Sequence, residues 1–248
     1  MYKILFWVIF LSFLILPLPA YPFSFAVFGD SLKGDSTYKR LIEKINSDKD
    51  IKFCIHLGDF AEEGKLKEYN KHIKMNKLLN VPIYHVKGNH DAVHLGYKYF
   101  KDFFGRSYYS FDYENAHFIV LDNALKNNFT KYQYDFMLED FKKNSKDHIF
   151  VFFHKPVFDS TTFFPDFLMD SRQMGDLMMK VFKKYTVKYV FSGHLHAYGR
   201  AEREGVVYIV SGGAGSPLHL PLFAGGFHHY IKVTVKDNKV VDETVKIY

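Results

Sequence analysis

The sequence has almost no cysteine: Cys54 is the single thiol among 248 residues. One thiol excludes a disulfide within the chain. Cys54 stands inside an apolar stretch, where a small buried side chain is expected rather than a catalytic thiol. The sequence also lacks internal repeats and low-complexity linkers, so we expect residues 21–248 to form one domain.

An apolar run long enough to cross a membrane as a helix is also absent. The run Ile4–Leu16 has thirteen residues, fewer than the roughly 20 that a membrane-spanning helix needs. It follows Lys3 and precedes Pro17–Ala20, a pattern typical of a secretory signal. Leu18 stands where cleavage sites prefer a small residue, so an uncleaved anchor is the alternative. We therefore expect residues 1–20 to be a signal peptide or N-terminal anchor of an exported protein, periplasmic or extracellular.

Charge of one sign does not collect in any stripe. The chain has 33 Lys and Arg against 27 Asp and Glu, a formal net charge of +6, and the lysines are spread along its length. This distribution argues against nucleic acid as the main partner and is compatible with an anionic substrate. Hydrophobic residues make up 48% and aromatic residues 19% of the chain, which indicates a globular protein with a heavy aromatic load.

Strands and helices alternate in the first half of the chain. Apolar side chains at helical spacing predict helices over Ser36–Ser47 and Lys65–Leu79, and short apolar runs that resemble buried strands lie between them. Strands alternating with helices of this length favour right-handed crossovers and a largely parallel core.

The pattern changes in the second half. A turn at Glu114–Ala116 between two apolar runs predicts a hairpin. Helical spacing returns over Lys131–Lys143 and Gly175–Tyr185. The tail predicts mostly antiparallel strands over Val206–Val210, His229–Val235 and Val240–Ile247. This order indicates either one mixed sheet or two sheets packed face to face with helices outside.

Short polar motifs follow the apolar strands directly. They are rich in Asp, Asn and His, the oxygen and imidazole ligands that suit a divalent metal, and they are Gly29-Asp30, Gly58-Asp59, Gly88-Asn89-His90-Asp91, His154 and Gly193-His194-Leu195-His196. The first three are separated by one strand–helix unit each, roughly 30 residues. This spacing predicts that their ligands meet at one edge of a sheet, where open α/β sheets build their sites.

The ordered set of motifs resembles the calcineurin-like metallophosphoesterases, with a layout similar to that of purple acid phosphatases. The resemblance covers nearly the whole chain after residue 20 and extends to the neighbouring stretches Val86–Asp91, His154–Pro156 and Ser192–Arg200. It implies an α/β fold of mixed α+β type: a four-layer α/β/β/α sandwich with two packed mixed β-sheets flanked by helices. It also implies a phosphatase or phosphodiesterase that uses a dinuclear metal centre and a metal-bridging hydroxide nucleophile.

The resemblance assigns metal-binding roles to six side chains. They would hold two divalent ions, Mn, Fe or Zn, with a bridging carboxylate between the ions. Asp59 would be the bridge, Asp30 and His196 would bind the first ion, and Asn89, His154 and His194 would bind the second.

Two departures from the family pattern concern the first ion. Many members have a histidine two residues after the first Asp, where this chain has Leu32. Purple acid phosphatases have a tyrosine three residues after the second Asp, where this chain has Glu62. The first metal site is therefore expected to have fewer protein ligands than the second and to lack the purple ferric chromophore.

The remaining candidates surround the metal ligands. The resemblance implies that His90 stands near the leaving group and that Asp91 orients it. Arg200 and Tyr198, just past the last motif, are candidates for contact with a phosphate. A small phosphorylated substrate is expected because no second recognition domain is apparent. The alternatives are an exported nuclease, a catalytically silent metallophosphoesterase-fold binding module, and a hydrolase tethered to a membrane by residues 4–16.

Overall fold

A computed structural model describes residues 21–163 and 168–248. The expected signal peptide or anchor, residues 1–20, lies outside the described residues. No described helix is long and apolar enough to cross a membrane.

The first sheet has five strands in the order β11-β10-β1-β2-β3. Its strands are β1 (Phe23–Phe28), β2 (Ile51–His56), β3 (Ile83–His85), β10 (His229–Lys236) and β11 (Lys239–Lys246). The strands β1, β2 and β3 run parallel, and β10 pairs antiparallel with both β1 and β11. The carboxyl ends of three successive strands therefore lie at one edge, as the spacing of the motifs predicts.

The second sheet has six strands in the order β4-β5-β6-β7-β9-β8. Its strands are β4 (Tyr109–Tyr113), β5 (Ala116–Val120), β6 (His148–Phe152), β7 (Tyr189–Ser192), β8 (Tyr198–Arg203) and β9 (Val206–Ser211). The hairpin β4–β5 is antiparallel, and β5, β6, β7 and β9 run parallel. Both sheets are mixed.

The two sheets pack face to face through aromatic side chains. Phe25 of β1 meets Phe118 of β5 and Phe150 of β6 edge-on, with ring centroids 5.2 Å apart in both pairs. Alternation along β1 explains this packing: Phe25 and Val27 face the other sheet, whereas Phe28 faces the outer helices. Because both faces of the strand are buried, its sequence is continuously apolar.

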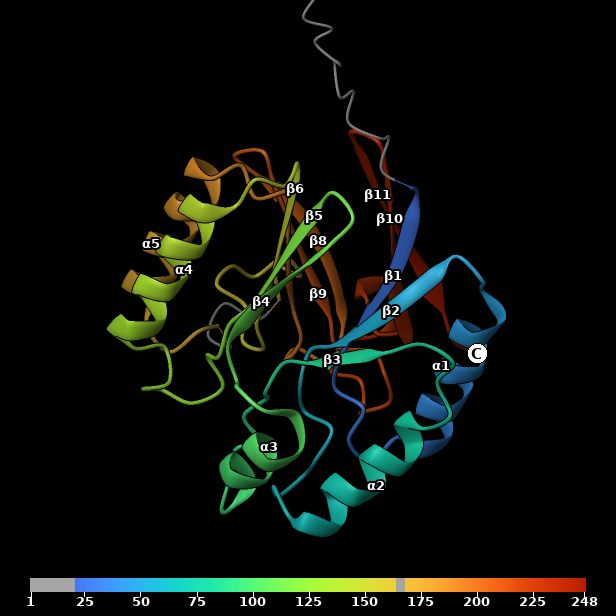
Figure 1. The fold of residues 1–248 in the computed structure, drawn as a ribbon. Helices are drawn as coiled ribbons and strands as arrows, with labels where there is room; N and C mark the ends of the chain where they lie inside the picture. The colour runs from blue at the N-terminus through green and yellow to red at the C-terminus, as the bar shows by residue number, and fades with distance from the viewer. Residues whose placement is uncertain (1–20, 164–167) are drawn as a thin grey trace, which may run out of the picture.

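Helices cover the outer faces, so the molecule has four layers (Figure 1). The helices are α1 (Asp35–Ser47), α2 (Leu66–Asn76), α3 (Gly96–Phe104), α4 (Lys131–Lys143) and α5 (Arg172–Lys184), with a short 3₁₀ turn η1 (Leu222–Ala224). In α1, Tyr38, Leu41, Ile42 and Ile45 form the buried stripe. The four-layer α/β/β/α fold expected from the resemblance is confirmed.

Two elements do not follow from the sequence pattern. The helix α3 begins at Gly96 without a capping side chain, so it lacks a start signal. The strand β8 lies at the edge of its sheet, and Arg200, Glu202 and Arg203 on it are exposed. An edge strand that faces water in this way has no apolar alternation to reveal it.

Candidate metal centre

The fold brings the six predicted ligand residues together at one edge of the sandwich. Asp30, Asp59 and Asn89 follow β1, β2 and β3 of the first sheet. His154 follows β6 of the second sheet, and His194 and His196 follow β7. Because the sheets pack face to face, the two sets of strand ends converge.

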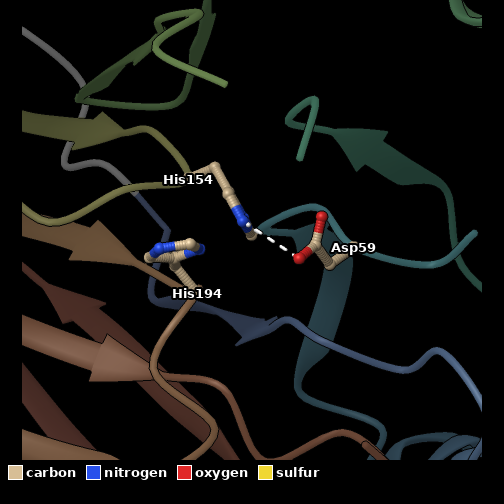
Figure 2. Close-up of side chains that lie close together, drawn as sticks. All are labelled: Asp59, His154 and His194. Carbon is tan, nitrogen blue, oxygen red and sulfur yellow. Dashed lines mark ion pairs between the residues drawn. The ribbon is translucent and has the colours of Figure 1, made fainter. Parts of the chain in front are cut away.

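Two clusters of ligand atoms share one carboxylate. Asp59, His154 and His194 form one cluster, and Asp30, Asp59 and His196 form the other, with the ligand atoms of each cluster within 4.8 Å of one another. Figure 2 shows the cluster of Asp59, His154 and His194, in which His154 Nε2 lies 3.2 Å from Asp59 Oδ2. Asn89 joins it, with Oδ1 3.0 Å from His154 Nε2. The sharing of Asp59 is the arrangement that a bridging ligand requires.

The backbone at three of these residues has an unusual conformation. Asp30, Asp59 and His194 have φ angles of 61°, 57° and 69°, in the left-handed region that side chains with a Cβ rarely adopt. Such conformations cost on the order of 1–3 kcal/mol each and persist where surrounding contacts enforce them. Three of the six candidate ligand residues are therefore held in this conformation by their surroundings.

The glycines of the motifs permit close approach of neighbouring strand ends. A Cβ added to Gly88 would overlap the carboxylate of Asp59, and one added to Gly193 would lie 2.5 Å from Asp30 Oδ2. Neither position has room for a side chain. Glycine before each ligand thus lets the carboxylates sit directly against backbone.

Backbone amides hold both buried carboxylates in place. The N–H of His194 donates to Asp30 Oδ1 and Oδ2 at 3.1 and 3.0 Å. The N–H of His90 donates to Asp59 Oδ1 at 2.9 Å. Each carboxylate is thus positioned by the backbone of another motif, and this leaves the remaining lone pairs free for a cation.

Two histidines are oriented by backbone carbonyls. His154 Nδ1 donates to the carbonyl of Leu57, and His196 Nδ1 donates to the carbonyl of Pro217, both at 2.8 Å. These bonds direct the Nε2 atom of each ring toward the carboxylates. Histidines that bind metals are commonly fixed in this way through their other ring nitrogen.

The buried carboxylates of the cluster favour a positive charge next to them. Burial raises the pKa of Asp30 well above its usual range. Burial also works against ionisation of Asp59, but the neighbouring His154 outweighs it and lowers the pKa of Asp59 to about 2. Burial alone would lower the pKa of His154, yet the carboxylates of Asp59 and Asp30 raise it to about 9. Buried carboxylates that draw a proton onto a histidine form a site suited to a cation.

The other two histidines are neutral bases. Burial lowers the pKa of His194 to about 3, and burial together with His219 lowers that of His196 to about 4. A neutral imidazole is the form that binds a metal. His194 Nδ1 is buried and has no hydrogen-bond partner among the described residues, which is the expected condition of a nitrogen reserved for a metal. The donor set of the described residues therefore fits a divalent cation.

Leu32 and Glu62, which stand at the two positions that depart from the family pattern, have other contacts. Leu32 is buried, and its N–H donates to the carbonyl of Asp59. The carboxylate of Glu62 forms an ion pair with Lys33. Within the described part of the chain, the first cluster thus consists of Asp30, Asp59 and His196 alone.

The side chains of Asp91 and His90, which the resemblance pairs, bind different partners in the structure. His90 Nδ1 lies 2.8 Å from the carbonyl of Glu62, which fixes the ring. The buried carboxylate of Asp91 instead accepts four backbone N–H groups: those of Asp59, Phe60, Ala61 and Gly88. An acid beside a histidine in sequence suggests a dyad, but the tight turn at Asn89 points the two side chains to different partners.

Asn123 is a site residue that sequence reasoning missed. Its Oδ1 accepts the N–H groups of His154 and Lys155 at 3.1 and 2.9 Å, and its Nδ2 donates to the carbonyl of Lys155 at 2.6 Å. It thereby fixes the backbone that carries the His154 imidazole. The signal was present, since Asp122-Asn123 directly follows the apolar strand β5 as the other motifs follow theirs.

The two candidate phosphate contacts have partners elsewhere. The guanidinium of Arg200 forms a two-point ion pair with Asp242, with both N–O distances 2.9 Å. Tyr198 packs with Phe227 and His229, at ring-centroid distances of 5.6 and 5.5 Å. The structure thus gives Arg200 the role of an ion pair that links β8 of one sheet to β11 of the other.

Comparisons with known sequences agree with this geometry. Residues 23–198 match the model of the family described as calcineurin-like phosphoesterase. Over 121 residues the chain is 31% identical to purple acid phosphatase 23 of Arabidopsis thaliana, a match that covers 44% of this chain and 26% of that protein. Purple acid phosphatase 15 of the same plant is 28% identical over 120 residues, which cover 44% of this chain and 22% of the relative. The matches therefore span about a quarter of these relatives.

Solved structures share the fold at low sequence identity. Purple acid phosphatase PPD1 from yellow lupin has a TM-score of 0.75 and 18% identity, over 94% of this chain and 54% of that one. A dimetal phosphatase from Danio rerio has a TM-score of 0.71 and 14% identity, over 92% and 96% of the two chains. GAP50, described as the anchor in the inner membrane complex of Plasmodium, has a TM-score of 0.70 and 16% identity, over 91% and 84%.

Proposed function

The chain belongs to the calcineurin-like phosphoesterase family, and from this premise we propose that it is a metal-dependent hydrolase of phosphoesters with a dinuclear centre. The observation that carries the proposal is the sharing of Asp59 between two clusters of ligand atoms. Asp59, Asn89, His154 and His194 would hold one divalent cation, and Asp30, Asp59 and His196 the other. Mn, Fe and Zn all suit such a mixed nitrogen and oxygen site.

Divalent cations at these ligands would neutralise charge on a phosphoryl group and make an attacking water more acidic. The chain's own residues would set the geometry. Asp59 is buried and fixed by the N–H of His90, so its carboxylate has little freedom to move. Asn123 and Asp91 hold the backbone on either side, so the ligands are arranged before a substrate arrives.

His90 is the proposed general acid for the leaving group. Its ring is exposed at the rim of the centre, and the bond from Nδ1 to the Glu62 carbonyl leaves Nε2 without a partner in the described chain. When protonated, Nε2 can donate a proton to the departing oxygen. General acid catalysis of this kind typically contributes about 10²–10⁴-fold to the rate.

The substrate is proposed to be a small phosphorylated molecule. The described residues form one four-layer unit, and its charged residues are scattered, which does not favour a long nucleic acid. The purple acid phosphatases and the dimetal phosphatase similar to this chain are named for phosphatase activity. Export is part of the proposal and rests on the pattern of residues 1–20.

The test is reconstitution of the full chain with Mn, Fe and Zn, followed by assay of phosphomonoesters and phosphodiesters. We expect hydrolysis with at least one metal, and near abolition by Asp59→Asn or His154→Ala while the circular dichroism spectrum stays unchanged. Full activity in either variant would contradict the dinuclear assignment. Less than one metal ion per chain together with no hydrolysis would instead favour the catalytically silent module. The small number of ligands in the first cluster is the argument for that alternative. Hydrolysis of DNA or RNA that is steeply weakened by salt would favour the nuclease.

A further inference from the structure

The connection between β9 and β10 carries an apolar tip at the site edge. Leu222 and Phe223, both in the 3₁₀ turn η1, are 68% and 90% exposed. No residue of η1 is buried, so the tip contributes little to the core. We call Pro217–Gly226 the tip loop.

One end of the tip loop is fastened to a candidate metal ligand. His196 Nδ1 donates to the carbonyl of Pro217 at 2.8 Å, and the N–H of His219 donates to the carbonyl of His196 at 3.0 Å. The rings of His196 and His219 also stack, with centroids 4.1 Å apart. The loop therefore begins directly against the first cluster.

The other end of the tip loop is fastened to the start of β8. The N–H of Tyr198 donates to the carbonyl of Gly225 at 2.8 Å. Within the loop, the N–H groups of Ala224 and Gly226 both donate to the carbonyl of Pro221, at 2.9 and 3.0 Å. Gly225 supplies the positive φ, 100°, that closes this turn. Leu222 and Phe223 are thus held by a hydrogen-bonded turn rather than by a loose loop.

The chemistry of the surrounding segment is uncharged. Between Ser211 and Ile231 the sequence contains no Lys, Arg, Asp or Glu. A charged or heavily hydroxylated leaving group, such as a sugar or a peptide, would find few polar side chains here. An alkyl or aryl group would instead remove two large apolar side chains from water, which is favourable in proportion to the area covered.

We propose that the tip loop is a subsite for the apolar leaving group of the substrate, which makes phosphate esters of alkyl or aryl alcohols the substrate class. The inference rests on the proposed function, since the phosphate end of the substrate occupies the Asp59 centre. The hydrogen bonds of the loop to His196 and to Tyr198 place its two ends beside that centre. Leu222 and Phe223 bind the apolar group and take no part in the chemistry.

The test compares ethyl, butyl and octyl phosphate, whose leaving groups differ in apolar length and hardly at all in reactivity. In the metal-loaded wild-type chain, we expect KM to fall roughly tenfold from ethyl to octyl phosphate. The double variant Leu222→Ser/Phe223→Ser should lose most of this ratio while its metal content stays that of wild type. Both side chains are exposed, so the variant is expected to fold.

A matched control removes exposed apolar side chains elsewhere. Leu78 follows α2 and Val241 lies on β11, and they are 48% and 61% exposed. The double variant Leu78→Ser/Val241→Ser should keep the wild-type ratio of KM values. A flat series in the wild type, or an unchanged ratio in the Leu222→Ser/Phe223→Ser variant, would overturn the inference.

Binding of non-hydrolysable analogues separates the two proposals. Calorimetry with ethyl- and octylphosphonate reports affinity without turnover. Tighter binding of octylphosphonate that depends on Leu222 and Phe223, together with no hydrolysis of any ester, would sink the proposed hydrolase and support the subsite. Hydrolysis with equal affinity for both phosphonates would support the hydrolase and overturn the subsite.

Discussion

The carboxylate of Asp91 accepts the backbone N–H of Asp59 at 2.8 Å. The same Oδ2 atom also accepts the N–H of Gly88 at 2.8 Å, while Oδ1 accepts those of Phe60 and Ala61. One buried side chain thereby ties the turn after β2 to the turn after β3. This contact enforces the left-handed conformation that Asp59, the carboxylate shared by both clusters, adopts.

Replacement of Asp91 should therefore damage the centre without removing a ligand. Asp91→Asn puts an amide N–H₂ in place of one oxygen, so the two buried N–H groups that donate to that oxygen lose their acceptor. We expect the free energy of unfolding to fall by about 3 kcal/mol and the bound metal to fall with it. Denaturant titration and elemental analysis measure the two effects. Wild-type stability together with wild-type metal content would show that the four hydrogen bonds do not position Asp59.

Gly88→Ala should have a similar effect on metal binding by a steric route. The new methyl group would overlap the Asp59 carboxylate, so the β2 and β3 turns must move apart. We expect metal affinity to fall at least tenfold although all six ligand side chains remain. Gly175→Ala is the matched control for expression and folding, since a Cβ there would meet its nearest atom, the carbonyl oxygen of Val157, at an ordinary contact distance of 3.5 Å. Equal metal affinity in Gly88→Ala and the wild type would contradict the close packing.

His90→Ala separates catalysis from metal binding. The imidazole is exposed, and its ring bonds the Glu62 carbonyl rather than a ligand residue. We expect kcat to fall by about 10²–10⁴-fold with metal content unchanged. His154→Ala should lose both activity and metal, because His154 contacts Asp59 and Asn89. Equal loss of metal in the two variants would mean that His90 belongs to the ligand set.

Arg200→Met distinguishes an ion pair from a phosphate contact. Since the guanidinium is held by Asp242, we expect the free energy of unfolding to fall by about 1 kcal/mol, with KM unchanged. Asp242→Asn should cause a similar loss. A several-fold rise in KM for every phosphoester, with stability intact, would restore Arg200 as a substrate contact.

His117 should make stability depend on pH. Burial lowers the pKa of its imidazole, but hydrogen bonds to Asp140 and Asp112, at 2.7 and 2.6 Å, outweigh burial and raise the pKa above its ordinary value. The charged ring thus stabilises the fold below its ordinary pKa, and this stabilisation disappears as pH rises through the raised pKa. We expect the difference in unfolding free energy between wild type and His117→Gln to shrink from mildly acidic to alkaline pH. If the difference in unfolding free energy did not depend on pH, His117 would not be charged between Asp112 and Asp140.

The sequence was most informative about elements with local signals. Leu41 and Ile45 at helical spacing predicted α1. The helix α4 begins at Lys131 and ends at Lys143, as the sequence predicted. The edge strand β8 and the uncapped helix α3 lacked such signals and were missed. For the site, the polar residues directly after buried strands predicted that the ligand side chains lie close together. The reason is that neighbouring parallel strands end at the same edge of a sheet.

By itself the sequence determined which side chains are available at the strand ends, since the order of strand, glycine and ligand is written locally along the chain. Only the tertiary structure decided their partners. Asp91 binds backbone more than 30 residues away in sequence, Arg200 pairs with Asp242, and the tip loop fastens to His196. These contacts join elements from different strands and sheets, and their geometry depends on how the two sheets pack, which no local pattern encodes.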